Sequence, residues 1–424
     1  MWSATTTCNL PSCNLPSCNL SPRNRPNAMT ILVADRIAPV GIETLKRAGH
    51  EVLIQPKLEG DALLEALSTH GPQVLIVRST RVTAAALDAS THLGLIVRAG
   101  AGYDTIDVEG ASNRGIFVAN CPGKNSVAVA ELTLGLILAL DRKIADNVAE
   151  ARAGHWNKEA FAQAAGLKNR RLGVVGVGSI GAAVIRRAHA FDLKVIAWSR
   201  SLTREDADRL GVGWRSDPME VAADADIVTL HLAATPDTKH LAGRSFFEAM
   251  SEGTVFINTS RASVVDEEAL AWAVDAKDLR VGLDVMSGEP AHKEGAFSHP
   301  LADHPNVYIT HHIGASTQQA QNATAEEAAR VVTTFDETGA VPNCVNLATQ
   351  TPATHQITVR HRDRVGVLAA ILDEMRRAEW NIQEMDNLIF EGAQAASASI
   401  RFDGAMDEAV IRRIEDHDDV FAVT

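Results

Sequence analysis

A glycine-rich turn between a strand and a helix constrains this chain more than any other feature. The segment "RRLGVVGVGSIGAAVIRRA" (170–188) follows an apolar, strand-like stretch and opens a helix-like one. Its glycines have G-x-G-x-x-G spacing, which permits a tight turn, close approach of backbone to a pyrophosphate, and close packing of helix on strand. The helix N-terminus adds positive potential. We therefore predict a dinucleotide site, with contacts from Gly176, Gly178, Ser179, Ile180 and Gly181.

The next strand, "VIAWSRS" (195–201), bears on which dinucleotide is bound. In such folds an acidic residue at its end binds the ribose hydroxyls of NAD and repels the 2′-phosphate of NADP. Here the chain has Ser199 and then Arg200. Serine repels no phosphate and a guanidinium pairs with one, so NADP is favoured over NAD. The alternative is that Arg200 is a solvated surface residue or stacks on the adenine.

Short apolar strands alternate with helical stretches along most of the chain, as in "TILVAD" (30–35), "QVLIVRS" (73–79) and "GTVFINTS" (253–260). This alternation indicates parallel sheets covered by helices on both faces, an α/β fold. A first α/β unit runs to about Ala119, a long helix is expected over 125–154, and a second unit begins near Arg170.

The C-terminal part has a different pattern. An aperiodic stretch at 346–354 predicts a linker, and 355–424 predicts strands and helices in βαββαβ order, a ferredoxin-like unit. Its first helix has one apolar face, made of Val367, Leu368, Ile371, Leu372 and Met375.

Composition excludes several partner classes. The 424 residues carry a formal charge of −13, which argues against nucleic acid and anionic membrane as partners. Cysteine usage shows no disulfide framework and favours a cytoplasmic location. Residues 1–28 contain Cys8, Cys13 and Cys18 among Pro, Ser and Asn. We expect a disordered extension there rather than a metal site, with a transit peptide as the alternative.

Three chemically suited side chains follow the ends of successive strands. Arg261 lies in "INTSRASVVD", Glu289 in "DVMSGEP" and His312 in "THHIGAST". Ligands of open α/β sheets bind outside the carboxyl ends of the strands, so these residues are expected to meet. Hydride transfer to a ketone needs a proton donor, a partner that orients the donor and a cation for a carboxylate, roles that suit His312, Glu289 and Arg261. Taken singly, each could be an ordinary surface or core residue.

These motifs, with "RAGAGYDTIDVEGASNRGI" and "GVGSIG" before them, resemble the D-isomer-specific 2-hydroxyacid dehydrogenases from Met29 to about Asn346. The resemblance implies a flavodoxin-like substrate-binding lobe of residues 29–122 and 311–345, and a Rossmann dinucleotide-binding lobe of 123–310. It implies that Arg261 binds the substrate carboxylate and carbonyl oxygen, that His312 is the general acid/base, and that Glu289 stabilises protonated His312. It also implies cofactor contacts from Thr259 and from Asp284, the latter at the nicotinamide end.

The tail, with "HQITVRHRDRVGVLAAI" and "WNIQ", resembles an ACT domain, an amino-acid-sensing module found on many members that act on phosphoglycerate. The resemblance implies effector contacts from His361, Asp363 and Asn381. The family often has Asn where this chain has Asp363, which leaves inhibition by serine open. Alternatively the unit only mediates oligomerisation. A homodimer through the nucleotide lobe is expected, or a homotetramer if the ACT units pair.

The favoured substrate is a small phosphorylated 2-hydroxy acid. Arg78 and Arg98 end two strands of the first unit and match positions that face substrate in such enzymes, where two arginines could hold a phosphate. Either could instead be a surface or interlobe residue. The predicted reaction is oxidation of 3-phospho-D-glycerate to 3-phosphohydroxypyruvate for L-serine synthesis. The alternatives are NADPH-dependent reduction of glyoxylate or hydroxypyruvate, and a dinucleotide-sensing regulator on the same scaffold.

Three positions depart from the family pattern. Ala262 replaces a glycine after the catalytic arginine, and would cost roughly 1 kcal/mol if its φ had to be positive. His311 replaces a proline before His312, and as a strand neighbour it should point away from the position of His312. Ser179 replaces an arginine in the glycine loop, which fits an altered cofactor site.

Overall fold

A computed structural model describes residues 28–290 and 295–424. The predicted extension, residues 1–28, lies outside the described residues except for Ala28. The chain divides into two compact units between Asn346 and Leu347. The first unit contains two parallel sheets, and we call the part built on each sheet the first lobe and the second lobe.

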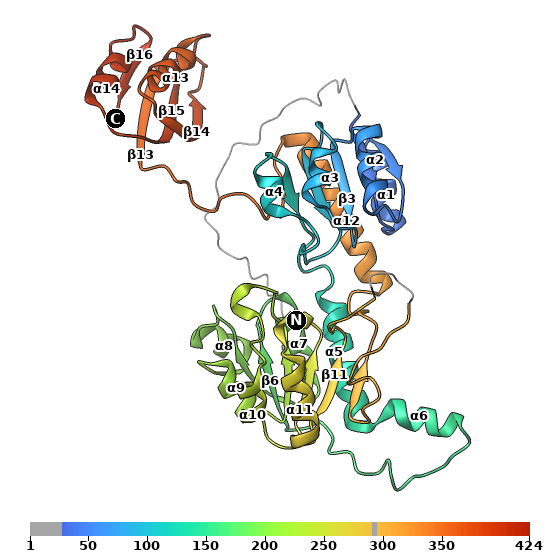
Figure 1. Cartoon of the computed structure of the whole chain (residues 1–424). Helices are drawn as coiled ribbons and strands as arrows, with labels where there is room; N and C mark the ends of the chain where they lie inside the picture. The colour runs from blue at the N-terminus through green and yellow to red at the C-terminus, as the bar shows by residue number, and fades with distance from the viewer. Residues whose placement is uncertain (1–27, 291–294) are drawn as a thin grey trace, which may run out of the picture. The chain divides into compact units, whose positions relative to one another are not determined.

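The first lobe has a five-stranded parallel sheet in the order β2-β1-β3-β4-β5, a flavodoxin-like order. Apolar side chains alternate between its two faces, so one face packs on α2, α3 and α4 and the other on α1 and α12. Helix α12 therefore brings a late part of the sequence back to the first lobe, where it lies beside α1 (Figure 1). The elements are β1 (Thr30–Val33), α1 (Pro39–Arg47), β2 (Glu51–Ile54), α2 (Asp61–His70), β3 (Val74–Val77), α3 (Ala84–Asp88), β4 (Leu95–Arg98), α4 (Val108–Ser112), β5 (Phe117–Ala119) and α12 (Gln318–Thr338).

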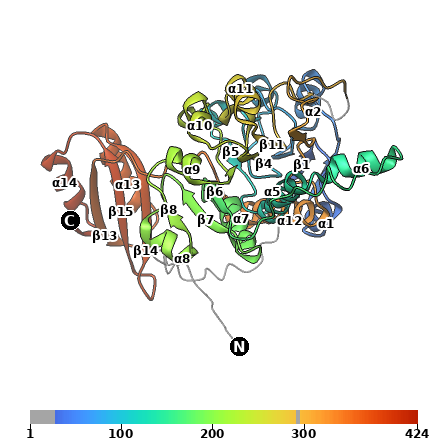
Figure 2. The same ribbon diagram turned by 90° about the horizontal axis from the view of Figure 1, so that it is seen from below.

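The second lobe has a seven-stranded parallel sheet in the order β12-β11-β10-β9-β6-β7-β8. The order reverses beside β6, as in a Rossmann fold, and the glycine loop follows that strand. Helices α9, α10 and α11 cover one face of the sheet, and α5, α7 and α8 cover the other (Figure 2). The elements are α5 (Ser126–Arg142), α6 (Ile144–Arg152), β6 (Arg171–Val175), α7 (Ser179–Ala190), β7 (Lys194–Trp198), α8 (Arg204–Leu210), β8 (Gly213–Trp214), α9 (Pro218–Asp224), β9 (Ile227–Leu230), the 3₁₀ turn Pro236–Thr238, α10 (Arg244–Ala249), β10 (Val255–Asn258), the 3₁₀ turn Ala262–Val264, α11 (Glu267–Lys277), β11 (Arg280–Leu283) and β12 (Val307–Ile309).

The prediction of one long helix over 125–154 is wrong in one respect, because this stretch forms two helices. Lys143 adopts a left-handed conformation with φ of 49°, which ends α5 and starts α6. Helix α5 buries ten of its side chains, whereas α6 buries none. The apolar residues Ile144, Val148 and Trp156 are therefore exposed on and just after α6.

The second unit has the predicted βαββαβ order. Its four strands form an antiparallel sheet in the order β14-β15-β13-β16, and both helices pack on one core with Val359, Met375 and Phe402. The α13 face predicted from the sequence packs there, with Val367, Ile371 and Met375 fully buried. The elements are β13 (His355–Arg362), α13 (Val367–Arg377), β14 (Asn381–Ile389), β15 (Ala395–Asp403), α14 (Glu408–Glu415) and β16 (Val420–Val423).

Within the described ranges, no helix is both long enough and apolar enough to cross a bilayer.

Candidate active site

The predicted catalytic residues all follow carboxyl ends of second-lobe strands. Arg261 comes after β10, Glu289 after β11 and His312 after β12, and these three strands are neighbours in the parallel sheet. The crevice outside the carboxyl ends of parallel strands is where open α/β folds bind ligands. The topology alone therefore brings the three side chains to one edge of the sheet.

His312 and Glu289 are hydrogen-bonded. The Nδ1 atom of His312 lies 2.8 Å from Oε2 of Glu289, and the second carboxylate oxygen accepts the backbone N–H of Met286 at 3.0 Å. The hydrogen bond from Glu289 and its charge raise the pKa of His312, outweighing partial burial and the nearby Arg261. Burial alone would raise the pKa of Glu289, but the bonds from His312 and Met286 outweigh it and the pKa falls. The pair thus favours a carboxylate beside a readily protonated imidazole whose Nε2 remains for a substrate.

Asp284 fixes the loop that carries His312. Its side chain is 1% exposed, and its two oxygens accept the backbone N–H groups of Ile313 and Gly314, each at 2.8 Å. A third bond comes from the hydroxyl of Thr310 at 2.6 Å. The bonded residues lie on both sides of His312 in the sequence, and His312 itself has a left-handed φ of 51°. The carboxylate predicted to meet the nicotinamide end therefore uses both oxygens within the protein.

Arg261 is held between the two lobes. Its Nη1 donates to the carbonyl of Ser260 at 2.8 Å, and its Nε lies 3.4 Å from a carboxylate oxygen of Asp104 in the first lobe. A side chain at Gly102 would place Cβ only 2.0 Å from Nη2 of Arg261, so glycine leaves room for the guanidinium. Ala262 has no positive φ and begins a 3₁₀ turn, so the strain considered from the sequence does not arise. Asp104 was not singled out from the sequence.

Arg98 and Arg78 add to the positive charge near Arg261. Burial lowers the pKa of Arg98, and repulsion from Arg261 and Arg78 lowers it further, while Asp104 opposes them. Among the described residues, Nε of Arg98 has no hydrogen-bond partner although it is buried. The backbone N–H of Arg78 donates to Asp35 at 2.7 Å, which fixes the end of β3. Arg98 therefore lies near two guanidinium groups that repel it, an electropositive site suited to an anion with more than one negative group.

The glycine loop has the form that a pyrophosphate requires. Gly176 is left-handed with φ of 98°, and a Cβ on Gly181 would lie 2.1 Å from the carbonyl oxygen of Gly176. By contrast, a Cβ on Gly178 would have no heavy atom within 4 Å, so open space faces the loop there. The N-terminus of α7 has no side-chain cap, and Ser179 beside it is exposed. Free backbone N–H groups at a helix start fit the diphosphate of a dinucleotide.

The residues expected near the adenosine ribose lie at the surface. Ser199 lines a cavity of about 370 Å³ together with Ser201, Asp206 and Arg209. Arg200 is 85% exposed, and its nearest charged partner, the equally exposed Asp237, is 3.8 Å away. Arg209 is paired with Asp206. The site therefore offers hydroxyl groups and two arginines, each of which already has an acidic neighbour.

The remaining predicted residues are placed as follows. Thr259 is buried, and its hydroxyl is 3.0 Å from that of Thr133 on α5. His361 is 1% exposed, with Nδ1 donating to the carbonyl of Arg362 at 2.8 Å and Nε2 lying 3.3 Å from Oδ1 of Asn387. Asp363 is partly exposed and Asn381 is exposed, in the same unit as His361.

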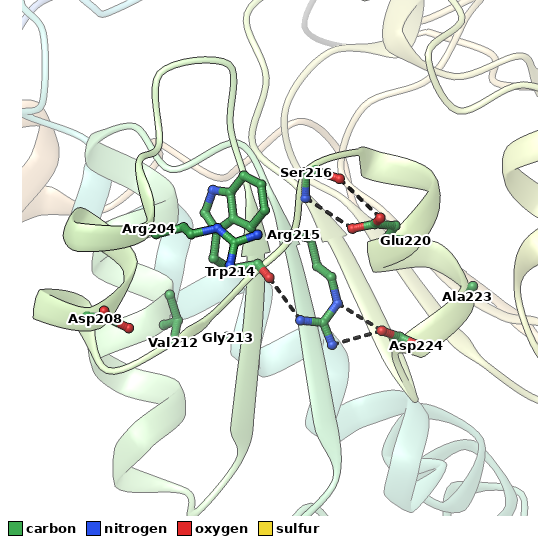
Figure 3. A pocket seen from close by; sticks show the side chains of 10 residues that line it. All are labelled: Arg204, Asp208, Val212, Gly213, Trp214, Arg215, Ser216, Glu220, Ala223 and Asp224. Atoms are coloured by element: carbon green, nitrogen blue, oxygen red, sulfur yellow. Dashed lines mark hydrogen bonds and ion pairs between the residues drawn. The ribbon is translucent and has the colours of Figure 1, made fainter.

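A hollow of about 790 Å³ lies elsewhere, at the β8 edge of the second-lobe sheet (Figure 3). Its polar side chains bond to one another: Arg215 with Asp224 at 2.8 Å, and Ser216 with Glu220 at 3.0 Å. The guanidinium of Arg204 covers the Trp214 ring at 4.5 Å. None of the predicted site residues lines this hollow.

A Rossmann lobe with an open glycine loop, beside a histidine paired with glutamate and an arginine, is typical of dehydrogenases that use a nicotinamide dinucleotide. Residues 134–314 match the family described as "D-isomer specific 2-hydroxyacid dehydrogenase, NAD binding domain". A hydroxypyruvate reductase from Thermotoga maritima is 38% identical over 266 residues, which cover 62% of this chain and 84% of that protein. The chain therefore belongs to the D-isomer-specific 2-hydroxyacid dehydrogenase family.

Two further relatives extend the comparison. A D-3-phosphoglycerate dehydrogenase from Methanocaldococcus jannaschii is 38% identical over 295 residues, 69% of this chain and 55% of that protein. The crystal structure of the TT0316 protein from Thermus thermophilus matches with a TM-score of 0.67 at 33% identity, covering 75% of this chain and 100% of that chain. This chain spans only somewhat more than half the length of the phosphoglycerate dehydrogenase it matches.

Proposed function

We propose that this protein oxidises 3-phospho-D-glycerate to 3-phosphohydroxypyruvate with NAD or NADP, the reaction that starts L-serine synthesis. The observation that carries the proposal is the group of Arg78, Arg98 and Arg261, in which Arg98 is repelled by both others and has a buried Nε without a partner among the described residues. A substrate with a carboxylate and a phosphate would supply negative charge to this group of guanidinium side chains. The phosphoglycerate dehydrogenase from M. jannaschii supports the same substrate.

In this mechanism Arg261 binds the substrate carboxylate and polarises the oxygen at the reacting carbon. His312 removes the hydroxyl proton during oxidation and returns it during reduction, through Nε2, because Nδ1 is bonded to Glu289. Glu289 stabilises the imidazolium form, and Asp284 holds the loop in place. The nicotinamide, when bound, accepts or donates the hydride.

The chain's own residues suit a dinucleotide. Gly176 to Gly181 and the uncapped start of α7 would hold the diphosphate, and Thr259, which follows β10, would contact the cofactor. At the ribose, Ser199 leaves room for a 2′-phosphate and Arg200 or Arg209 supplies a cation. We therefore favour NADP, with NAD as the alternative cofactor.

The C-terminal unit is proposed to be an ACT domain that binds an amino acid through residues near His361, Asp363 and Asn381. Its antiparallel sheet and βαββαβ order support this assignment. The buried His361 would have to exchange its bond to Asn387 for one to the effector. Oligomerisation through the unit alone is the competing role.

We further propose a homodimer through the second lobe, with a tetramer if C-terminal units also pair. Helix α6 supports this, since it buries no side chain within the described chain and Trp156 just after it is 89% exposed. Both views show α6 extending away from the sheet of its lobe (Figures 1 and 2). Exposed apolar side chains of this kind are typical of subunit contacts.

Cysteine usage favours the cytoplasm.

The second candidate function is NADPH-dependent reduction of glyoxylate or hydroxypyruvate, which Ser199 and the T. maritima relative favour. The deciding experiment compares initial rates on 3-phosphohydroxypyruvate and hydroxypyruvate, each with NADH and NADPH. The proposal expects kcat/KM to be much higher for the phosphorylated substrate. A preference for hydroxypyruvate with NADPH would replace this proposal by the second candidate.

A further inference from the structure

A cluster of three polar side chains lies outside the residues assigned so far. Glu267 is the first residue of α11, directly after Asp266, which caps that helix. One oxygen of Glu267 accepts the backbone N–H of Ser287 at 2.6 Å. The other accepts the hydroxyl of Ser287 and lies 3.2 Å from Nε2 of His299. The Glu267 side chain is 21% exposed and that of His299 is 4% exposed.

The hydrogen bond at Nδ1 of His299 determines which ring nitrogen carries the proton. Nδ1 accepts the backbone N–H of Leu301 at 3.3 Å, so in the neutral ring Nε2 carries the hydrogen and donates it to Glu267. The carboxylate of Glu267 therefore accepts three hydrogen bonds and donates none. An amide in its place would have a single oxygen and could not accept all three.

Ser287 belongs to the turn that carries Glu289. Within this turn Met286 donates its N–H to Glu289, and Gly288 is left-handed with φ of 71°. The same Glu289 carboxylate then bonds to Nδ1 of His312. Glu267 therefore bonds to Ser287 and Glu289 bonds to Met286 and His312, and the backbone of the Met286–Glu289 turn joins these two sets of hydrogen bonds.

We propose that Glu267 is a positioning residue that fixes the Met286–Glu289 turn and thereby the orientation of the His312 imidazole. The inference rests on the roles proposed above for His312 and Glu289. The rigid helix start holds the exposed part of the turn, Ser287 to Glu289, whereas Met286 at its beginning is buried in the core. Side chains that act in proton transfer depend on such support, because a displacement of about 1 Å can cost ~100-fold in rate.

The test substitutes Glu267→Gln and compares it with Glu268→Gln. Both changes remove one negative charge from the first turn of α11, so the effect on the helix dipole is matched. Glu268 is exposed, and the bonds to Ser287 and His299 are made by Glu267 and not by Glu268. For Glu267→Gln we expect kcat to fall about tenfold with KM changed less than about twofold, because proton transfer rather than binding is disturbed. Glu268→Gln should leave both unchanged.

The second readout is independent of turnover. The pKa of His312 is measured by NMR on protein with isotope-labelled histidine, with its signals identified by their loss in His312→Asn. Groups facing His312 are Glu289 and Asp284, which raise its pKa, and Arg261, which lowers it. Glu267→Gln should lower the pKa of His312, because Glu289 is less well held, and Ser287→Ala should lower it by less.

The outcomes separate the two proposals. Equal His312 pKa values in Glu267→Gln and Glu268→Gln would overturn the positioning role, whatever the substrate. If wild type turns over no 2-hydroxy acid, the proposed function fails while the titration still tests Glu267. If Glu267→Gln does not fold, the test uses Ser287→Ala, which changes an exposed residue. An unchanged pKa of His312 in Ser287→Ala would then also overturn the positioning role of Glu267.

Discussion

Nδ1 of His312 lies 2.8 Å from Oε2 of Glu289, and each residue shifts the pKa of the other toward its charged form. The pKa of His312 is raised above 6.5, so its contribution to stability is present below that pH and is lost as pH rises through the folded pKa. The pKa of Glu289 is lowered below 4.5, so its contribution is present above that pH and is lost as pH falls through the folded pKa. The pair therefore stabilises the fold most between these limits.

Glu289→Gln should shift the alkaline limb of the reduction rate to lower pH. Reduction needs protonated His312, and without the carboxylate the pKa of His312 falls, so the proton donor is lost earlier as pH rises. At neutral pH we expect kcat for reduction to fall about 10- to 100-fold. The measurement is kcat against pH, with exposed Glu252→Gln as control. An alkaline limb that coincides with that of wild type would remove Glu289 from this role.

Two substitutions in the glycine loop should affect different properties: one should lower dinucleotide affinity, and the other should lower the free energy of unfolding. Gly178→Ala adds a methyl group that meets no heavy atom within 4 Å, so the free energy of unfolding should stay within about 0.5 kcal/mol of wild type while dinucleotide affinity falls. Gly181→Ala places Cβ 2.1 Å from the Gly176 carbonyl oxygen, so it should lower the free energy of unfolding by about 1–3 kcal/mol. Denaturant unfolding and calorimetric titration with NAD and NADP distinguish them. Unchanged affinity in Gly178→Ala would contradict the assigned loop.

The sequence predicted those features whose signals are local. Apolar strands and the glycine loop lie within short windows, and both parallel sheets follow from them. The break at Lys143 was missed because lysine favours helices, and only the end of packing on α5 reveals it. The bonds of Asp104 to Arg261 and of Glu267 to Ser287 join residues distant in sequence, and no local pattern marks such pairs. The same holds for Asn387, the partner of His361.

Ser199→Asp should reverse the preference between cofactors. A carboxylate at the end of β7 would accept from the ribose hydroxyls of NAD and repel the 2′-phosphate of NADP. The ratio of kcat/KM with NADPH to that with NADH should fall at least about tenfold, which corresponds to roughly 1.4 kcal/mol. The companion variant Arg200→Ala should lower the same ratio by removing a cation. If neither variant alters the ratio, the cofactor is not selected at this strand end.

Arg98→Gln should discriminate between substrates with and without a phosphate. The change removes a buried cation that Arg261 and Arg78 repel, so the unliganded protein should be no less stable than wild type. Loss of one charge-assisted hydrogen bond should lower kcat/KM for 3-phosphohydroxypyruvate about 10- to 100-fold. The loss for hydroxypyruvate, which lacks the phosphate, should be much smaller. Arg81→Gln, an exposed arginine on the same lobe, is the matched control and should change neither value. Equal losses on both substrates would mean that Arg98 contacts the carboxylate end or only supports Arg261, and the phosphate would then have to be bound elsewhere.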